Sequence, residues 1–579
     1  MELRSQEVRT LAPENDPLKM GMGWKVEDLS KPQIMVESTF GDSHPGSAHL
    51  DQFVKEAVQA VNDNGGKAAR YFATDMCDGI AQGHDGINYS LPHRDAIVNL
   101  VEAQANASVY DGGVFIASCD KSVPAMLMSI GRLKDMSAIV VTGGVMEAHT
   151  LPKEYVVNDP ACAINELLTL EQIGKFDAWE KTGVIPNSQL DYYKHNACPS
   201  CGACSFMGTA STMQIMAEAL GLMLPGTALM PATAPELKQA AYDAGKQLME
   251  LVKKGITAKD IVTKKSFENA IMVHAAISGS TNATMHLPAI AHEFGFEIDA
   301  DTFDRMHRGA HYLLNIRPSG DWPAQYFYYA GGVPRVMEEI KSMLHLDVMT
   351  VTGKTLGENL EDLQRDNFFQ RNLGYLHNYG LERDQVIFPV DQAREKGSVA
   401  ILRGNLAPEG AVIKYSACSQ EMREMEGPAR VFDREEDAYQ AVVDGAVEPG
   451  DILVIRYEGP KGGPGMREMF KAMKYMYGVG LSKSAALITD GRFSGTNNGC
   501  FVGHISPEAA EGGPLAIVHD GDEILIDVDE GVLELHVSDE EIAERYKTLE
   551  LPKKNIPNGY LRLYAKVAAS ADEGAIIKA

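Results

Sequence analysis

The first third of the chain alternates short apolar runs with longer segments that have helical spacing of their apolar residues. The predicted strands lie at 34–36, 68–75, 113–117 and 138–142, and the predicted helices between them at 49–62 and 94–105. Strands that alternate with helices favour a parallel sheet with helices on both faces. The pattern therefore predicts an N-terminal α/β domain.

The pattern changes after about residue 375. Short β-rich runs, such as 400–402 and 451–457, are separated there by turns rich in Gly, Pro and Asp. This arrangement is typical of a mostly-β domain. We expect three parts: an N-terminal arm over residues 1–32, the α/β domain over 33–380, and a β-rich domain over 381–579.

Composition limits the partners that the protein can have. The 579 residues include 53 Lys and Arg against 80 Asp and Glu, a net charge of −27. Such a surface repels nucleic acid and anionic membranes, so we expect neither as a partner. The chain has no signal-peptide core and no apolar run long enough to span a bilayer. Its eight cysteines then favour a reducing compartment with thiols as ligands, and we expect a cytoplasmic enzyme.

Two Cys-Asp pairs follow predicted strands, at the sheet edge where ligands of parallel sheets collect. They are Cys77-Asp78 and Cys119-Asp120, and Lys121 follows the second pair directly. A thiolate suits iron, whereas a carboxylate suits magnesium or manganese. Neighbouring side chains of an extended stretch point to opposite sides, so each pair could serve two metal centres. One such pair would more commonly be explained by a core cysteine, but two pairs favour metal chemistry.

A third source of thiols is the loop that carries Cys198, Cys201 and Cys204. A helix predicted to begin near Thr209 presents its amino end to this loop, and such an end favours anionic groups. Two readings without catalysis stay open: a zinc site on these three cysteines, and an iron–sulfur protein that acts as a sensor or electron carrier.

Two glycine-rich stretches, 458–469 and 489–499, mark the second domain. The first lacks the Gly-Lys-Ser/Thr of a phosphate-binding loop, so we predict no nucleotide site. Its glycines allow close approach to a small ligand, and Glu468 near its end is a candidate metal ligand. Ser494 lies in a turn, where a serine beside glycine usually has a structural role. Together with the metal ligands, it is a candidate catalytic hydroxyl.

These stretches resemble the IlvD/Edd family of dihydroxy-acid and sugar-acid dehydratases. The similarity runs in order from about residue 19 to 575 and includes CDGIAQGHDGINYSL, ASCDK, CPSCGACSFMGTAST, EGPKGGPGMREM and LITDGRFSG. The resemblance implies dehydration of a 2,3-dihydroxy carboxylate to a 2-oxo acid, with an iron–sulfur cluster and a divalent cation. It also implies an α/β domain followed by a barrel-like domain, and a homodimer or homotetramer.

The resemblance also implies a role for each candidate residue. The cluster ligands would be Cys77, Cys119 and Cys204; the ligands of magnesium or manganese would be Asp78, Asp120, Lys121 as a carbamate, and Glu468; the catalytic base would be Ser494. Members with a two-iron cluster carry a cysteine where this chain has Pro45-Gly46, so a 4Fe-4S cluster is favoured over a 2Fe-2S cluster. Cys198 and Cys201 are then bystanders.

The substrate is the least determined feature. The stretches MGMGW, SLPHRD, VHAAISGSTN and YYAGGVPRVM resemble the xylonate-type branch, whereas VIRYEGPKGGPGM and GYLRLYAKVAASADEGA resemble the branched-chain branch. We expect an aldonic sugar acid such as xylonate, gluconate or arabonate, converted to the 2-keto-3-deoxy acid. The alternative is the dihydroxy-acid dehydratase of branched-chain amino acid biosynthesis. An apolar pocket would suit a branched substrate, and a polar one a polyol tail.

Overall fold

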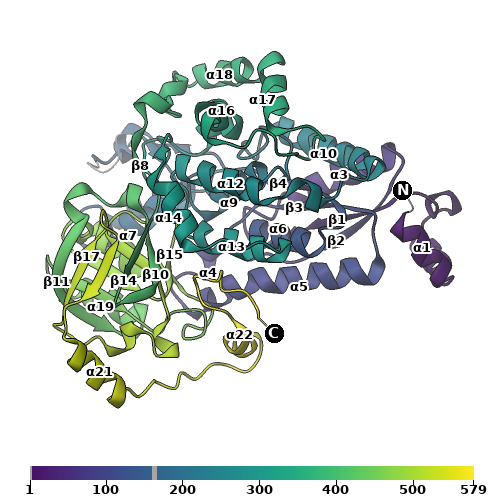
Figure 1. The fold of residues 1–579 in the computed structure, drawn as a ribbon. Helices are drawn as coiled ribbons and strands as arrows, with labels where there is room; N and C mark the ends of the chain where they lie inside the picture. Colours follow the sequence, from purple (N-terminus) through teal and green to yellow (C-terminus); the bar gives the residue numbers. More distant parts are fainter. Residues whose placement is uncertain (1–2, 159–165, 579) are drawn as a thin grey trace.

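The computed structural model describes residues 3–158 and 166–578. An N-terminal α/β body and a C-terminal β-barrel lie side by side, and two short helices, α1 (Arg4–Leu11) and α2 (Asn15–Gly21), precede the first strand (Figure 1). The predicted fold class, a parallel-sheet α/β domain followed by a barrel-like β domain, is confirmed. Within the described ranges, every helix is too short or too polar to cross a bilayer.

A four-stranded parallel sheet with the order β2-β1-β3-β4 is the centre of the N-terminal body. Its strands are β1 (Gln33–Ser38), β2 (Lys67–Phe72), β3 (Gly112–Ala117) and β4 (Ser137–Thr142). Every residue of β1, β3 and β4 is buried, because helices cover both faces and leave only β2 as a partly exposed edge. The continuous apolar runs in the sequence follow from this burial.

The helices form layers on the two faces of the sheet (Figure 1). On one face, α3 (Leu50–Asp63) and α10 (Pro235–Lys254) pack against each other and against the strands. On the other, α6 (Ser122–Arg132) packs against β3 and β4, with α5 (Ser90–Ser108) and α13 (Ala283–Phe294) behind it.

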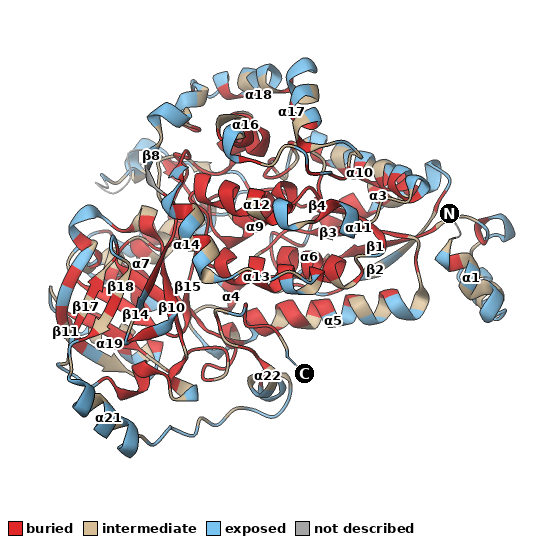
Figure 2. Ribbon diagram, in the orientation of Figure 1, coloured by how far each residue is buried: buried red, intermediate tan, exposed pale blue. Residues whose placement is uncertain are grey.

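Burial is greatest where the helices meet the sheet and the barrel (Figure 2). Every residue of α9 (Thr209–Ala219) is buried, as expected of a helix that lies inside a large core. Among the outer helices, α21 (Asp539–Thr548) is largely exposed, whereas α17 (Leu356–Arg365) and α18 (Phe368–His377) are partly exposed (Figure 2).

Eight strands close the C-terminal barrel in the order β10-β16-β14-β12-β11-β17-β18-β9. The strands β11, β12, β14 and β16 pair in parallel, and the connections between them contribute loops to the site. The strands are β9 (Ala400–Gly404), β10 (Ala407–Ile413), β11 (Glu424–Phe432), β12 (Ile452–Ile455), β14 (Ala486–Thr489), β16 (Phe501–Ser506), β17 (Glu523–Asp527) and β18 (Val532–Leu535).

Two short strands outside the barrel bring its loops onto the N-terminal body. They are β13 (Glu468–Met469) and β15 (Arg492–Phe493), which pair in parallel. The turn after β15 then packs on the loop before α9: a Cβ added to Gly495 would lie 2.7 Å from the Cα of Gly208. The contact is so close that only glycine fits at position 495.

Candidate active site

A cavity of about 730 Å³ lies where the carboxyl ends of the strands meet the barrel loops. Seven of the eight predicted site residues line it: Cys77, Asp78, Cys119, Asp120, Cys204, Glu468 and Ser494. The eighth, Lys121, is buried and donates a hydrogen bond from Nζ to Asp78 Oδ2 at 2.8 Å. The fold therefore gathers residues that are far apart in the sequence around one space.

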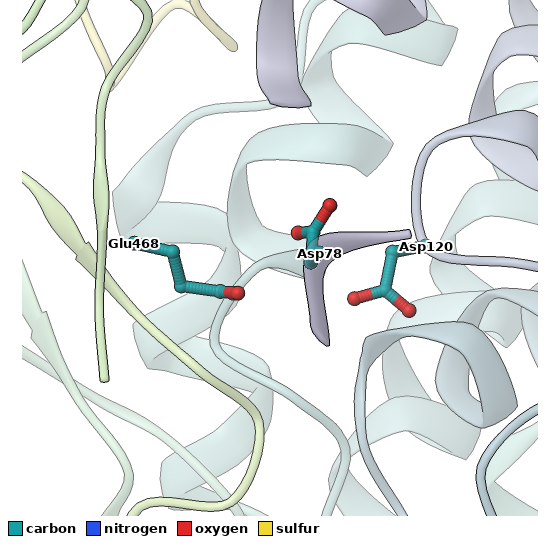
Figure 3. A group of neighbouring side chains, drawn as sticks. All are labelled: Asp78, Asp120 and Glu468. Carbon is teal, nitrogen blue, oxygen red and sulfur yellow. The ribbon is translucent and has the colours of Figure 1, made fainter. Parts of the chain in front are cut away.

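Three carboxylates form a compact group in this cavity. Asp78 begins the short helix α4 (Asp78–Ala81), Asp120 lies in the turn before α6, and Glu468 comes from β13. Each offers an oxygen, and these oxygens all lie within 4.8 Å of one another. Figure 3 shows Glu468 and Asp120 pointing toward one another, with Asp78 between them in this view. Three convergent carboxylate oxygens are a suitable ligand set for a hard divalent cation.

Two buried cations accompany the carboxylates. Lys121 pairs with Asp78, and Arg492 donates from Nη1 to Glu468 Oε1 at 2.9 Å and lies 3.5 Å from Asp78 Oδ2. Burial would raise the pKa of Asp78, but the charges of Lys121 and Arg492 outweigh it and hold that pKa below its ordinary value. The group thus has three potential negative charges against two positive ones, and the excess of negative charge favours a cation.

Asp120 differs from Asp78 because no side chain donates a hydrogen bond to it among the described residues. Burial raises the pKa of the Asp120 carboxyl group; Lys121 opposes this, and the neighbouring carboxylates of Asp78 and Glu468 add to it. A metal ion would stabilise the ionised form of this carboxyl group strongly, because the ion supplies the positive charge that the surroundings lack.

Three residues that the sequence analysis did not assign hold the carboxylates in place. Arg492 bridges Glu468 and Asp78, Ser90 Oγ donates to Asp78 Oδ1 at 2.7 Å, and Asn282 Nδ2 donates to Glu468 Oε1 at 3.0 Å. Arg492 stands two residues before Ser494, and Ser90 and Asn282 lie in other stretches of the family resemblance. Their place in these similar stretches was the only sequence feature that pointed to them, and it applied equally to the neighbouring residues.

The three cysteines Cys77, Cys119 and Cys204 are close enough to interact electrostatically. Burial raises the pKa of each thiol, and nearby carboxylates raise it further; for Cys119 and Cys204 the neighbouring thiols add to this effect. Such thiols stay protonated unless a metal compensates the thiolate charge. The donor set therefore fits a metal cluster better than it fits free nucleophilic cysteines.

The remaining cysteines are placed differently. Cys198 is exposed at the edge of the cavity, and Cys201 is partly exposed outside its lining. Cys418 and Cys500 are buried in the barrel core. Cys162 lies outside the described residues. Cys77, Cys119 and Cys204 are therefore the described cysteines that share the cavity with the carboxylates, apart from the exposed Cys198.

Ser494 faces the cavity from the turn after β15. Thr496 Oγ1 donates a hydrogen bond to Ser494 Oγ at 3.3 Å. Lys474, on the helix α20 (Lys471–Gly478), donates from Nζ to the carbonyl oxygen of Thr496 at 3.1 Å. Burial lowers the pKa of Lys474 to about 7. The turn is thus fixed by its neighbours, and Ser494 lines the same cavity as the carboxylates.

The outer wall of the cavity combines apolar and polar side chains. Leu170, Ile173, Phe470 and Tyr475 contribute apolar surface. Glu171 and Lys474 are buried in the same wall.

Both halves of the chain match one enzyme family. Residues 31–359 match the family model of the dihydroxy-acid/6-phosphogluconate dehydratase N-terminal domain, and residues 385–575 match that of the C-terminal domain. The chain belongs to this family of metal-dependent hydro-lyases, as the sequence motifs predicted, and it is an enzyme.

The curated relatives give a narrower comparison. The chain is 42% identical to dihydroxy-acid dehydratase 1 of Methanosarcina acetivorans over 97% of each chain. It is 43% identical to the dihydroxy-acid dehydratase of Acetivibrio thermocellus over 96% of each chain, and 42% identical to that of Methanosarcina barkeri over 98%. These names agree with the predicted alternative substrate better than with the sugar acid that the sequence analysis preferred.

Proposed function

We propose that this chain is a dihydroxy-acid dehydratase, which removes water from a branched 2,3-dihydroxy carboxylate and yields the 2-oxo acid used in branched-chain amino acid synthesis. The observation that carries the proposal is the convergence of Asp78, Asp120 and Glu468 with three cysteines and Ser494 on one cavity. The names of the relatives support the choice of substrate.

Cys77, Cys119 and Cys204 would hold an iron–sulfur cluster, and Asp78, Asp120 and Glu468 would hold Mg²⁺ or Mn²⁺. Bound there, these groups would supply a Lewis acid for the departing C3 hydroxyl and a positive charge for the enolate oxygen. Members with a two-iron cluster carry a cysteine where this chain has Pro45-Gly46. A Cβ at position 46 would lie 2.3 Å from Cys119 Sγ, so the loop as it stands has no room for a side chain there. This supports a 4Fe-4S cluster on the three thiols. Lys121 could join the cation ligands only as a carbamate, because its ammonium now pairs with Asp78.

Ser494 would take the proton from C2 of the substrate. A serine hydroxyl is a weak base unless its alkoxide is stabilised. The hydrogen bond that Thr496 donates to Ser494 Oγ favours the charged form, and Lys474, which bonds the carbonyl oxygen of Thr496, would add to this effect when it is protonated. Arg492 and Asn282 would keep Glu468 in position during this step.

The apolar part of the wall, which includes Ile173 and Phe470, supports a branched aliphatic substrate end. A second candidate is dehydration of an aldonic sugar acid. The observation that favours it is the pair of buried polar residues Glu171 and Lys474 in the same wall, which could bind the hydroxyl groups of a polyol.

A substrate panel tests the proposal. Anaerobically prepared protein with Mg²⁺ is assayed for 2-oxo acid release from 2,3-dihydroxyisovalerate, xylonate, gluconate and arabonate, with Ser494→Ala as the control. We expect the highest kcat/KM for dihydroxyisovalerate. A preference for a sugar acid would select the second candidate, and iron-loaded protein without turnover of any substrate would favour a sensor.

We further propose that the chain forms at least a homodimer. Leu11, Leu18, Met22 and Val26 in the N-terminal arm have more than half of their surface exposed, at 77%, 71%, 64% and 67%. Exposed apolar side chains gathered on one segment are typical of an interaction surface. Light scattering at micromolar concentration tests this, and a mass near 63.0 kDa would contradict it.

We also retain the predicted division at residues 32 and 380 as a proposal. The parallel sheet ends at Thr142 and the barrel strands begin at Ala400, which supports separate N-terminal and C-terminal units.

A further inference from the structure

The loop between β1 and α3 carries a histidine that lies between a buried carboxylate and a buried cysteine. His44 Nε2 is 3.6 Å from Asp75 Oδ2, and His44 Nδ1 is 3.7 Å from Cys119 Sγ. The side chains of His44 and Asp75 are 1% and 0% exposed. Asp75, His44 and Cys119 thus form a continuous buried array that ends at a proposed cluster ligand.

The loop is packed directly over the sulfur. A Cβ at Gly46 would lie 2.3 Å from Cys119 Sγ and 3.1 Å from His44 Nδ1. The backbone N–H of Gly46 donates to His44 Nδ1 at 3.1 Å, and that of Gly202 donates to the carbonyl of Pro45 at 2.9 Å. The imidazole ring is therefore held against Cys119 by the backbone as well as by its own contacts.

The inner polar atoms of this pair, His44 Nε2 and Asp75 Oδ2, are buried and close to each other. Among the residues that the structure describes, His44 Nε2 and Asp75 Oδ2 have no hydrogen-bond partner, and these two atoms lie 3.6 Å apart. Asp75 Oδ1 accepts a hydrogen bond from the backbone N–H of Met76 at 2.8 Å. A buried carboxylate without a partner is costly, so the two side chains are expected to stay paired.

We propose that His44 and Asp75 are positioning residues for Cys119. Asp75 holds the imidazole ring from its Nε2 side, and the Nδ1 edge of the ring packs against the sulfur and keeps it in place for iron coordination. The inference rests on the proposed function, because it requires a cluster at Cys119. Groups around a ligand sulfur orient it, limit its access to solvent and set the reduction potential of the cluster. His44 and Gly46 line the cavity beside Cys119 and cover one side of its sulfur.

Three variants test this inference in the full chain. His44→Asn removes the sulfur contact and keeps an acceptor for the Gly46 N–H, and Asp75→Asn removes the carboxylate charge at nearly constant shape. His84→Asn is the matched control: His84 Nδ1 accepts the same type of bond from Gly86 N–H at 3.0 Å, but its side chain is exposed. Thermal unfolding of each metal-free variant shows whether it folds like the wild type.

Iron and sulfide per chain are measured after anaerobic reconstitution, followed by the decay of the visible cluster absorbance in air. We expect His44→Asn and Asp75→Asn to lose the cluster ~10–100-fold faster than the wild type and the His84→Asn control. Equal decay in all four proteins would overturn the inference. If the wild type itself binds no iron, the proposed function fails. If the wild type binds iron and the variants lose their cluster at the wild-type rate, the inference alone fails.

The reduction potential separates a positioning role from a loss of packing. Asp75→Asn removes a negative charge close to the cluster, so its midpoint potential is expected to move to a more positive value. His84→Asn should leave the potential unchanged. An unchanged potential in Asp75→Asn would show that the carboxylate does not act on the cluster. If His44→Asn does not fold, Asp75→Asn still decides the question.

Discussion

Lys414, at the end of strand β10, allows a quantitative test of the structure. Its side chain is buried, and Nζ has no hydrogen-bond partner in the described part of the chain. Burial lowers the pKa of Lys414 from the ordinary 10.5 to about 7. The nearby His274 is also buried, and its pKa is lowered to about 4 by burial and by the charge of Lys414. We predict that Lys414→Met stabilises the protein at neutral pH.

The expected gain follows from the two pKa values of Lys414. In the unfolded chain the amine is protonated up to pH 10.5, whereas in the folded chain it loses its proton at about 7. Between these values the unfolded state binds more protons, so the stability of the wild type rises with pH. At about 1.4 kcal/mol for each pKa unit, removing the amine is worth up to about 4 kcal/mol at pH 7 and about 2 kcal/mol at pH 9.

The assay is thermal unfolding of Lys414→Met and the wild type at several pH values from 7 to 10. The difference in midpoint should be largest at pH 7 and shrink toward pH 10. Lys238→Met, which changes an exposed lysine on α10, is the control and should show neither effect. A variant that is destabilised at pH 7, or whose gain does not depend on pH, would refute the reasoning.

The remaining predictions concern the cavity. Ser494→Ala should keep the iron content and Mg²⁺ affinity of the wild type but lose ~10²–10⁴ in kcat, because it removes a positioned base; normal exchange of the substrate C2 hydrogen with D₂O would show that another group takes this proton. Glu468→Gln should weaken Mg²⁺ binding in calorimetry, and wild-type affinity in this variant would remove Glu468 from the ligand set. Since the pKa of Asp120 is raised in the metal-free protein, Mg²⁺ affinity should fall as the pH is lowered through neutrality, with proton release on binding. An affinity that does not change with pH would contradict this.

The sequence was most informative where local structure places a side chain. Cys119 and Asp120 follow a buried parallel strand, so their position at the ligand-binding edge of the sheet followed from the strand pattern. Arg492 and Asn282 could not be assigned in this way. They reach Glu468 only because β13, β15 and the loop before α13 meet in the folded chain. The contact between His44 and Asp75 likewise joins two loops that no local pattern connects.

The preference for a sugar acid has a physical explanation as well. It depended on four stretches: MGMGW in the arm, SLPHRD in α5, VHAAISGSTN at residues 273–282, and YYAGGVPRVM around α16 (Gly332–Glu339). None of the residues in these stretches is among those that line the cavity of the described structure. Similarity there does not involve the residues that line the cavity, whereas substrate choice would depend on lining residues such as Ile173, Phe470 and Lys474.

The most direct test of the account is the position of solvent hydrogen in the product. Anaerobically reconstituted enzyme is incubated with 2,3-dihydroxyisovalerate and Mg²⁺ in D₂O, and the 2-oxo acid is trapped and examined by NMR and mass spectrometry. Loss of the C2 proton and the C3 hydroxyl, followed by ketonisation, predicts a 2-oxo acid with one deuterium at C3. Iron-loaded enzyme that yields no 2-oxo acid, or a product with protium at C3, would contradict the account.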